Sequence, residues 1–231
     1  MKKVVALTGA GMSADSGLKT FRDSGGLWEG YNVQEVATPK AWRQNPARVL
    51  EFYNLRRKQS YKAEPNAGHK ALARLEEKFD VTIITQNVDN LHERAGSSNI
   101  IHLHGELSKV RSVKDDSLIY DIGDGEIKLG DTAGDGGQLR PHIVWFGEMV
   151  PNMEIAAEEV SKAEILIVIG TSLVVYPAAG LVNYVDAGIP KFIIDPVKPE
   201  LYDARGWEHI QENAATGTPA LVDRLLSTPD T

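Results

Sequence analysis

The 231-residue chain contains no cysteine, and only 7% of its residues are aromatic. The lack of cysteine excludes disulfide bonds, thiol nucleophiles, iron–sulfur ligation and any zinc site built from thiolates. Long apolar runs are also missing, since none approaches the roughly 18 residues that a membrane span requires. Residues 1–9 contain two lysines and a short apolar stretch that runs into glycine-rich sequence, which predicts a first strand and no signal peptide. We therefore expect a cytoplasmic protein without membrane contacts.

Positive charge is in deficit, because 25 Lys and Arg stand against 32 Asp and Glu, which gives a net charge of −7. Proteins that hold nucleic acid by counterion release normally carry a basic surplus, so nucleic acid is disfavoured as a partner. The apolar fraction of 42% and the charged fraction of 25% are typical of a globular protein. We expect one domain over residues 1–231, as a monomer.

Short unbroken runs of β-branched and other apolar residues alternate with helical patterns along the chain. The runs at residues 4–7, 81–85, 165–169 and 191–195 predict strands that are covered on both faces, as in a parallel sheet. Helical patterns lie at about 46–61, 66–78, 152–162, 177–187 and 218–227. This alternation predicts a doubly wound α/β core, in which ligands bind beyond the carboxyl ends of the strands.

The loop after the first strand is rich in glycine and reads Gly-Ala-Gly-Met-Ser-Ala over residues 9–14. Between a strand and a helix it is typical of a phosphate cradle, because glycine lets the backbone approach a pyrophosphate and a helix N-terminus offers free N–H groups. The spacing differs from the G-x-G-x-x-G of common dinucleotide folds, and a tight strand-to-helix turn is the alternative. Arg22, which follows Thr20 and Phe21, would contact either a phosphate or the carbonyls of the loop itself.

Polar side chains also follow the second strand, where Gln86, Asn87 and Asp89 lie in sequence. An Asn and an Asp two residues apart can hold a primary amide such as that of nicotinamide, one donating to its oxygen and the other accepting from its nitrogen. The alternative is that Asn87 or Asp89 caps the helix that follows.

His102 and His104 share one face of a short predicted strand. His104 is a candidate base near neutral pH, and Gly105 beside it would let a ligand come close. A structural role for either histidine is the alternative. The pair also suggests a metal, but no third ligand is near in sequence, so we expect none.

Two more loops follow predicted strands. Gly170, Thr171 and Ser172 come after the most apolar run, and Asp195 ends the last one. Asp195 would either bind a ribose hydroxyl or cap a turn.

Together these motifs resemble those of the sirtuins, a family of NAD-dependent protein-lysine deacylases. The matching segments occur in family order at residues 9–13, 16–17, 20–22, 85–92, 104–105, 139–148, 170–173 and 177–179. The combination is specific, although no single motif is. The resemblance implies a Rossmann-like part over about 1–30, 73–105 and 141–231, and a smaller lobe formed by two insertions at about 31–72 and 106–140. NAD and an acyl-lysine peptide would meet in the cleft between them.

The resemblance also implies residue roles, with His104 as the general base. The NAD-binding residues that it implies are Gly9, Ala10, Gly11, Ser13, Ala14, Thr20, Phe21, Arg22, Trp28, Gln86, Asn87, Asp89, Gly170, Thr171, Ser172, Asp195 and Ala214. Two segments, Gly147–Met149 and Leu173–Tyr176, would clasp the substrate backbone as an added strand. The substrate-binding residues that the resemblance implies there are Val144, Phe146, Gly147, Glu148, Val174 and Val175. The products would be nicotinamide, free lysine and O-acyl-ADP-ribose.

The sequence departs from the sirtuin pattern in the small lobe, where the family usually carries two Cys-x-x-Cys pairs that hold a structural zinc. The corresponding positions are Ser112 with Asp115 and Thr132 with Asp135. Neutral hydroxyls bind zinc poorly compared with thiolates. We therefore predict a lobe without zinc, held by side-chain hydrogen bonds and local packing.

Tyr53 and Arg56 are three residues apart on one face of the predicted helix at 46–61. They match the Tyr-x-x-Arg pair with which sirtuins of the desuccinylase and demalonylase type (class III) read the carboxylate of an acidic acyl group. A guanidinium offers paired donors to a carboxylate, and a phenol adds one more. The alternative is a surface arginine beside a core tyrosine.

The resemblance thus predicts removal of succinyl and malonyl groups, with weaker deacetylation. Three other functions stay open: a general deacetylase, a protein ADP-ribosyltransferase and a non-catalytic NAD-sensing module.

Overall fold

A six-stranded parallel sheet forms the centre of the computed structural model, which describes residues 1–19, 27–28, 31–199 and 205–229. The strand order is β11-β10-β9-β1-β4-β5. The strands are β1 (Lys3–Thr8), β4 (Asp80–Thr85), β5 (Ile100–His102), β9 (Ile165–Ile169), β10 (Lys191–Ile194) and β11 (Trp207–Ile210). The α/β class predicted from the apolar runs is confirmed.

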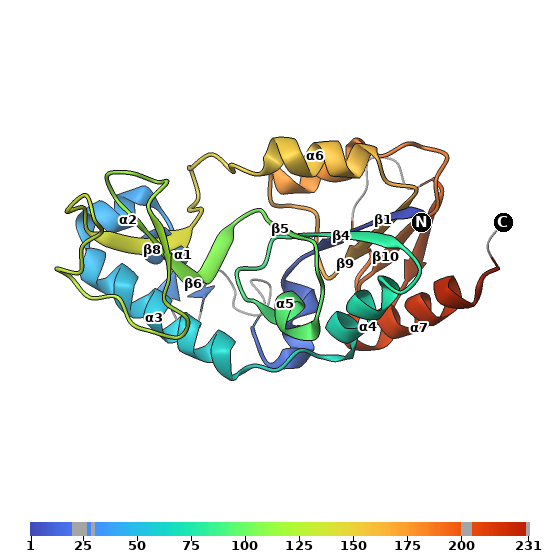
Figure 1. Ribbon diagram of the computed structural model, residues 1–231, viewed down its shortest axis with the longest axis horizontal. Helices are drawn as coiled ribbons and strands as arrows, with labels where there is room; N and C mark the ends of the chain where they lie inside the picture. Colours follow the sequence, from blue (N-terminus) through green and yellow to red (C-terminus); the bar gives the residue numbers. More distant parts are fainter. Residues whose placement is uncertain (20–26, 29–30, 200–204, 230–231) are drawn as a thin grey trace.

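Alternate residues of the central strands face two different helical layers. Val4 and Ala6 of β1 pack with α4 (Ala67–Leu75) and α7 (Ala214–Ser227). Val5 and Leu7 pack with α6 (Met153–Ser161) and with the 3-10 helix η4 (Ala178–Asn183) on the opposite face. Figure 1 shows α6 on one side of the sheet and α4 and α7 on the other. Coverage on both faces explains why these strands carry apolar residues on both of their faces.

A smaller lobe lies at the other end of the molecule (Figure 1). It contains α1 (Val33–Val36), α2 (Pro39–Gln44), α3 (Pro46–Lys62) and an antiparallel sheet of β6 (Gly105–Ser112), β7 (Ile119–Asp121) and β8 (Leu139–Ile143) in the order β7-β6-β8. A short hairpin of β2 (Leu27–Trp28) and β3 (Tyr31–Asn32) precedes it.

The three helices of this lobe begin where the sequence supplies caps. The side chains of Asn32, Thr38 and Asn45 each accept a hydrogen bond from a backbone N–H in the first turn of the next helix. Proline occupies the first position of both α2 and α3, where its missing N–H leaves no helical hydrogen bond unmade. Val49 and Phe52 of α3 then pack against Leu107 of β6.

Several predicted boundaries are wrong. Helix α4 packs in the core of the large sheet through Leu72 and Leu75, so the small lobe ends before this helix and not at residue 72. The helical pattern at 177–187 is a short 3-10 helix, and α7 begins at Ala214, so that Pro219 lies inside it.

No helix of the described residues is long and apolar enough to cross a membrane.

Candidate active site at the strand ends

The glycine-rich loops after β1 and β9 are interlocked. Gly9 N donates to Ile169 O at 3.0 Å, and Gly11 N donates to Gly170 O at 2.8 Å. A Cβ at position 11 would lie 2.7 Å from the Cα of Gly170, whose own φ of +61° favours glycine. These glycines are therefore required for the packing of the two loops against each other. This role is separate from the one that the sequence suggests, which is to let the backbone approach a pyrophosphate. The loop forms two 3-10 turns, η1 (Ala10–Met12) and η2 (Ala14–Ser16), rather than the expected α-helix.

Asn87 and Asp89 meet the first loop at Ser13, and all three are buried. Asn87 Nδ2 donates to Gly9 O at 3.0 Å and to Ser13 Oγ at 3.1 Å, and Ser13 Oγ donates to Asp89 Oδ2 at 3.0 Å. Both amide hydrogens of Asn87 are thus used inside the protein, so the predicted donation from Asn87 to a carboxamide oxygen is not supported.

Asp89 keeps the capacity to accept from a ligand, because a carboxylate has about four acceptor sites. Its Oδ1 accepts from Leu91 N at 3.2 Å, at the start of α5 (Leu91–Ala95), so the capping alternative holds in part. Burial raises the pKa of Asp89, although hydrogen bonds from Leu91 and Ser13 oppose the shift. A buried acceptor needs a hydrogen-bond donor, and the primary amide of nicotinamide would supply one.

His104 lies just beyond β5, and its ring is fixed by one hydrogen bond. Nδ1 donates to the Gln86 carbonyl at 3.0 Å, since a carbonyl oxygen only accepts. Nδ1 therefore carries the proton in the neutral ring, and Nε2 presents a lone pair. Burial lowers the pKa of His104. The ring is therefore uncharged at neutral pH, and its Nε2 can accept a proton. The Gln86 side chain donates to Thr171 Oγ1 at 3.1 Å and so ties this loop to the one after β9.

Gly105 has a different role from the one its place beside His104 suggests. A Cβ there would lie 2.0 Å from the carbonyl oxygen of His142, and φ is +82°. The glycine is required by the close crossing of β6 and β8, whether or not a ligand approaches His104.

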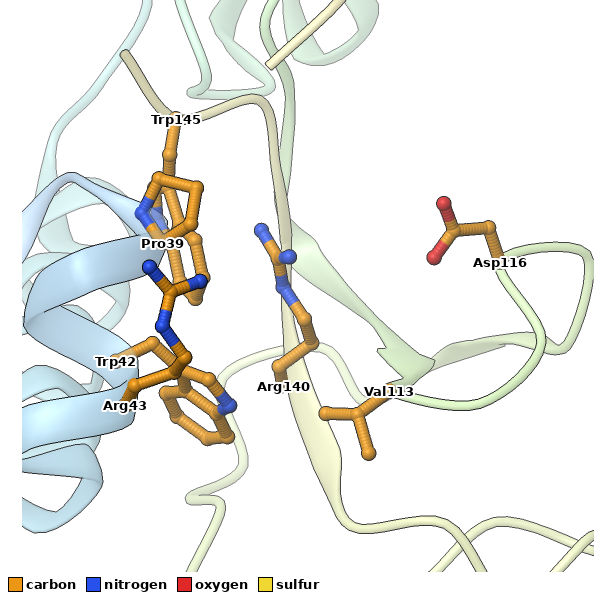
Figure 2. Close-up of a pocket in the computed structure, with 7 residues that line it drawn as sticks. All are labelled: Pro39, Trp42, Arg43, Val113, Asp116, Arg140 and Trp145. Carbon is orange, nitrogen blue, oxygen red and sulfur yellow. The ribbon is translucent and has the colours of Figure 1, made fainter. Parts of the chain in front are cut away.

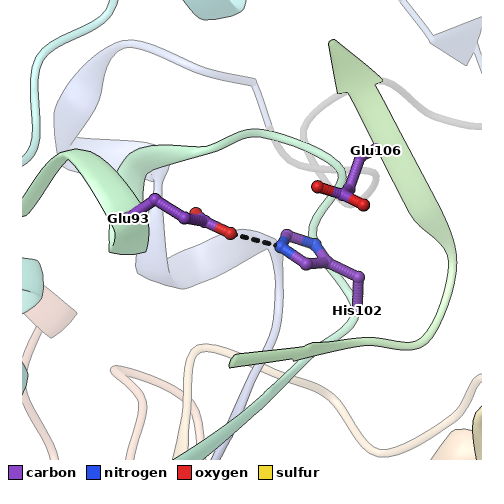
Figure 3. Close-up of side chains that lie close together, drawn as sticks. All are labelled: Glu93, His102 and Glu106. Carbon is purple, nitrogen blue, oxygen red and sulfur yellow. Dashed lines mark hydrogen bonds and ion pairs between the residues drawn. The ribbon is translucent and has the colours of Figure 1, made fainter. Parts of the chain in front are cut away.

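His102 differs from His104 in having acceptors at both ring nitrogens. Nε2 lies 2.6 Å from Glu93 Oε1 (Figure 3), and Nδ1 lies 3.3 Å from Asn87 O. Burial disfavours the charged ring, but the hydrogen bond and charge of Glu93 outweigh it and raise the pKa of His102. Ligand atoms of Glu93, His102 and Glu106 lie within 4.8 Å of one another, yet His104 is not among them. The two histidines therefore do not form the metal pair that their spacing suggests.

The structure describes most of the remaining predicted cofactor residues. Asp195 Oδ1 accepts from Val197 N at 2.9 Å, which makes it a turn cap. Ala214 is the first residue of α7 and lies in the core cluster that also contains Met12. Ala10 and Ala14 are exposed, and Ser172 is half-buried. Thr20, Phe21 and Arg22 lie outside the described residues, and Trp28 is placed only by its backbone pairing with Tyr31.

Tyr53 and Arg56 both lie on α3, as predicted. Tyr53 is 1% exposed, and its hydroxyl accepts a hydrogen bond from Trp145 Nε1 at 3.1 Å. Burial raises the pKa of Tyr53 to about 12, against the opposing charge of the nearby Arg56. The phenol is therefore protonated at neutral pH and can donate. Trp145 was not among the candidate residues of the sequence, because nothing in its apolar segment distinguishes it from a core residue.

Some groups of the first predicted substrate segment already make hydrogen bonds within the protein. Val144 N donates to His104 O at 3.0 Å and Phe146 N donates to Ala37 O at 3.0 Å. The Glu148 carboxylate accepts from Arg140 at 2.7 and 3.1 Å and from Trp145 N at 2.8 Å. Its side chain thus stabilises this turn.

Exposed groups remain on both substrate segments. Gly147 is exposed, with φ +93°, and the side chain of Phe146 is also exposed. On the second segment Val174 is exposed and Val175 is half-buried.

A hydrogen bond joins two of the four positions at which the resemblance predicts zinc cysteines in other members of the family. Ser112 Oγ lies 2.9 and 2.8 Å from the two oxygens of Asp135, whose Oδ1 also accepts from Gly137 N at 2.8 Å. Asp115 instead accepts from Ser117, and Thr132 pairs through its backbone with Gln138. We call the contact of Ser112 with Asp135 the lobe clasp.

Comparisons with known proteins agree with this geometry. The model of the Sir2 family matches residues 9–177. A protein of Bacteroides thetaiotaomicron named NAD-dependent protein deacylase is 53% identical, and the alignment covers 99% of this chain and 100% of that protein. A Helicobacter pylori protein of the same name is 52% identical, with 98% and 96% covered.

Solved structures show the same similarity over the whole fold. A mutant Sir2 homologue in complex with ADP-ribose is 39% identical with a TM-score of 0.90, covering 100% of this chain and 95% of that one. A complex of a Sir2 homologue with NAD is 40% identical with a TM-score of 0.88, covering 97% and 90%. A Sir2 protein bound to an acetylated peptide is 30% identical with a TM-score of 0.78, covering 96% and 91%. With these matches and the site described above, the chain belongs to the Sir2 family.

Proposed function

We propose that this chain is an NAD-dependent protein-lysine deacylase that prefers acidic acyl groups, succinyl and malonyl. The observation that carries the proposal is the His104 ring, whose Nδ1 is held by Gln86 O so that Nε2 is left to accept a proton at the edge where the loops of β1, β4 and β9 meet. The deacylase part of the proposal is supported by the relatives that match this chain over 96% and 100% of their own length, which are named NAD-dependent protein deacylase.

The roles of the residues follow from their contacts. NAD, when bound, supplies a ribose carbon from which nicotinamide departs as the acyl oxygen adds. Asp89 accepts from the carboxamide and orients it, while the interlocked loops of Gly11 and Gly170 hold the backbone that faces the phosphates. His104 Nε2 would take the proton of a ribose hydroxyl, and one water molecule is consumed as free lysine and O-acyl-ADP-ribose are released beside nicotinamide.

The acyl preference rests on Tyr53 and Arg56. A protonated phenol and a guanidinium together offer the donors that a terminal carboxylate requires. An acetyl group has no carboxylate that could accept from the half-buried Arg56. Loss of one side of a buried charged pair typically costs about 2–5 kcal/mol, which favours the acidic acyl groups by about 30-fold or more.

A side-by-side assay of acetyl-, malonyl- and succinyl-lysine peptides, with and without NAD, tests the proposal. We expect kcat/KM to be higher for succinyl and malonyl than for acetyl by about 30-fold or more, and no turnover without NAD. Equal rates on all three peptides would identify a general deacetylase. Label from NAD that remains on protein would indicate ADP-ribosyl transfer, and thermal stabilisation by NAD without nicotinamide release would indicate a sensor.

We also propose that the lobe clasp replaces a structural zinc. Purified protein should then hold no zinc in stoichiometric amount, and a chelator should leave its thermal unfolding midpoint unchanged. Replacing Ser112 by Ala removes a buried hydroxyl that donates to Asp135, so the midpoint should fall by a few degrees. About one tightly bound zinc per chain, measured by elemental analysis, would contradict this proposal.

A further inference from the structure

The hydrogen bond between Trp145 and Tyr53 has only one possible direction. An indole N–H donates and cannot accept, so the Tyr53 oxygen is the acceptor of the 3.1 Å contact. The hydroxyl hydrogen of Tyr53 is therefore left for another partner. Among the residues that the structure describes, none accepts it. The raised pKa of Tyr53, about 12, ensures that this hydrogen is present.

Trp145 is itself held on several sides, and only 2% of its surface is exposed. Its backbone N donates to Glu148 Oε2 at 2.8 Å, and the guanidinium carbon of Arg140 lies 3.4 Å from the centre of its ring. The ring centre of Trp42 lies 5.7 Å from that of Trp145. Trp42, Arg140 and Trp145 all line a pocket of about 190 Å³ (Figure 2). The indole N–H thus has a fixed position relative to α3.

A fixed donor changes what the Tyr53 hydroxyl can do. A phenol that accepts one hydrogen bond donates a second one more strongly, because successive hydrogen bonds polarise each other in a medium of low dielectric constant. The occupied lone pair also restricts where the hydroxyl hydrogen points. Arg140 over the indole face draws electron density from the ring, which makes the N–H a better donor.

We propose that Trp145 is a positioning residue for acyl selection, whose indole N–H orients the Tyr53 hydroxyl to donate to the acyl carboxylate. This inference rests on the proposed function, because it assigns Tyr53 and Arg56 to the carboxylate. It adds a residue outside the Tyr-x-x-Arg pair, on the segment that follows β8. In this proposal Trp145 acts through Tyr53 and has no role at the reacting carbonyl or at NAD.

The test replaces the indole N–H and changes little else. Incorporation of 3-benzothienylalanine at position 145 keeps the ring shape and substitutes sulfur for the N–H. Trp145→Phe is the simpler second variant. We expect kcat/KM for the succinyl-lysine peptide to fall by about 3- to 10-fold, mainly through KM, while the acetyl-lysine rate is unchanged.

A double-mutant cycle separates positioning from packing. In a Tyr53→Phe background the change at 145 should have no further effect on succinyl-lysine, because the hydroxyl that it orients is gone. Trp42→Phe, which alters the neighbouring ring, is the matched control and should leave the ratio of succinyl to acetyl rates unchanged.

The outcomes distinguish the two proposals. If the unmodified protein shows no preference for acidic acyl groups, the proposed acyl preference fails and this inference fails with it. If the preference exists and the benzothienyl variant retains it, or loses activity equally on all acyl groups, Trp145 is not a positioning residue although the proposed function stands.

Discussion

Replacing His104 by Tyr is expected to lower kcat/KM for deacylation by about 10²- to 10⁴-fold, the range that a general base contributes. The imidazole Nε2 is free to accept a proton because Nδ1 donates to Gln86 O. A tyrosine phenol is protonated at neutral pH and cannot take this role. The rate of nicotinamide release on acyl-lysine peptides measures the effect.

The control for this variant is the other histidine of the motif. His102 already has an acceptor at each ring nitrogen, so it offers no lone pair to a substrate. His102→Gln should retain activity within about tenfold of the unmodified protein, well short of the loss of a general base. Thermal unfolding and NAD binding should be nearly unchanged in His104→Tyr. A His104 variant that keeps full activity would exclude this residue as the base.

Replacing Arg56 by Met is expected to reduce kcat/KM for succinyl- and malonyl-lysine by about 30- to 4,000-fold, as for the loss of one partner of a buried charged pair. The acetyl-lysine rate should change little, because an acetyl group has no carboxylate to bind. Competing peptides that differ only in the acyl group give this ratio directly.

Two other arginines of α3 serve as controls. Arg48 is exposed and pairs with Glu35, so Arg48→Met should change neither stability nor selectivity to a measurable extent. Arg57 is buried and donates to the carbonyl oxygens of Leu107 and Gly125, so Arg57→Met should destabilise the fold and affect all acyl groups alike. Equal losses on all three acyl groups in Arg56→Met would show that Arg56 is structural too.

The strand pattern was predictable because each central strand is apolar on both faces, and four of the predicted runs are β1, β4, β9 and β10. The edge strand β11 was not predictable, because Trp207–Ile210 is only four residues long and has two polar residues between its two apolar ones. The 3-10 geometry of η4 was also not predictable, since an apolar pattern alone does not separate it from an α-helix.

The site was predictable to the level of loops but not of contacts. Parallel topology brings Gln86, Asn87 and Gly170 to one edge of the sheet, which follows from the position of each after a strand. Which hydrogen bonds Asn87 makes, and that Gly105 is needed against His142, depend on contacts between segments distant in sequence. The hydrogen bond of Trp145 is likewise made to Tyr53 of α3, 92 residues earlier in the chain.

The lobe clasp has a consequence for chemical durability. Cysteine thiolates that hold zinc are oxidised by peroxide, and the metal is then released. This chain has no cysteine, and its two loops are joined by a hydroxyl and a carboxylate that peroxide does not attack. The N–H of Gly137 and the hydroxyl of Ser112 lower the pKa of Asp135 below its ordinary value, so the clasp weakens only as acid protonates that carboxylate. Its integrity is thereby independent of cellular redox poise.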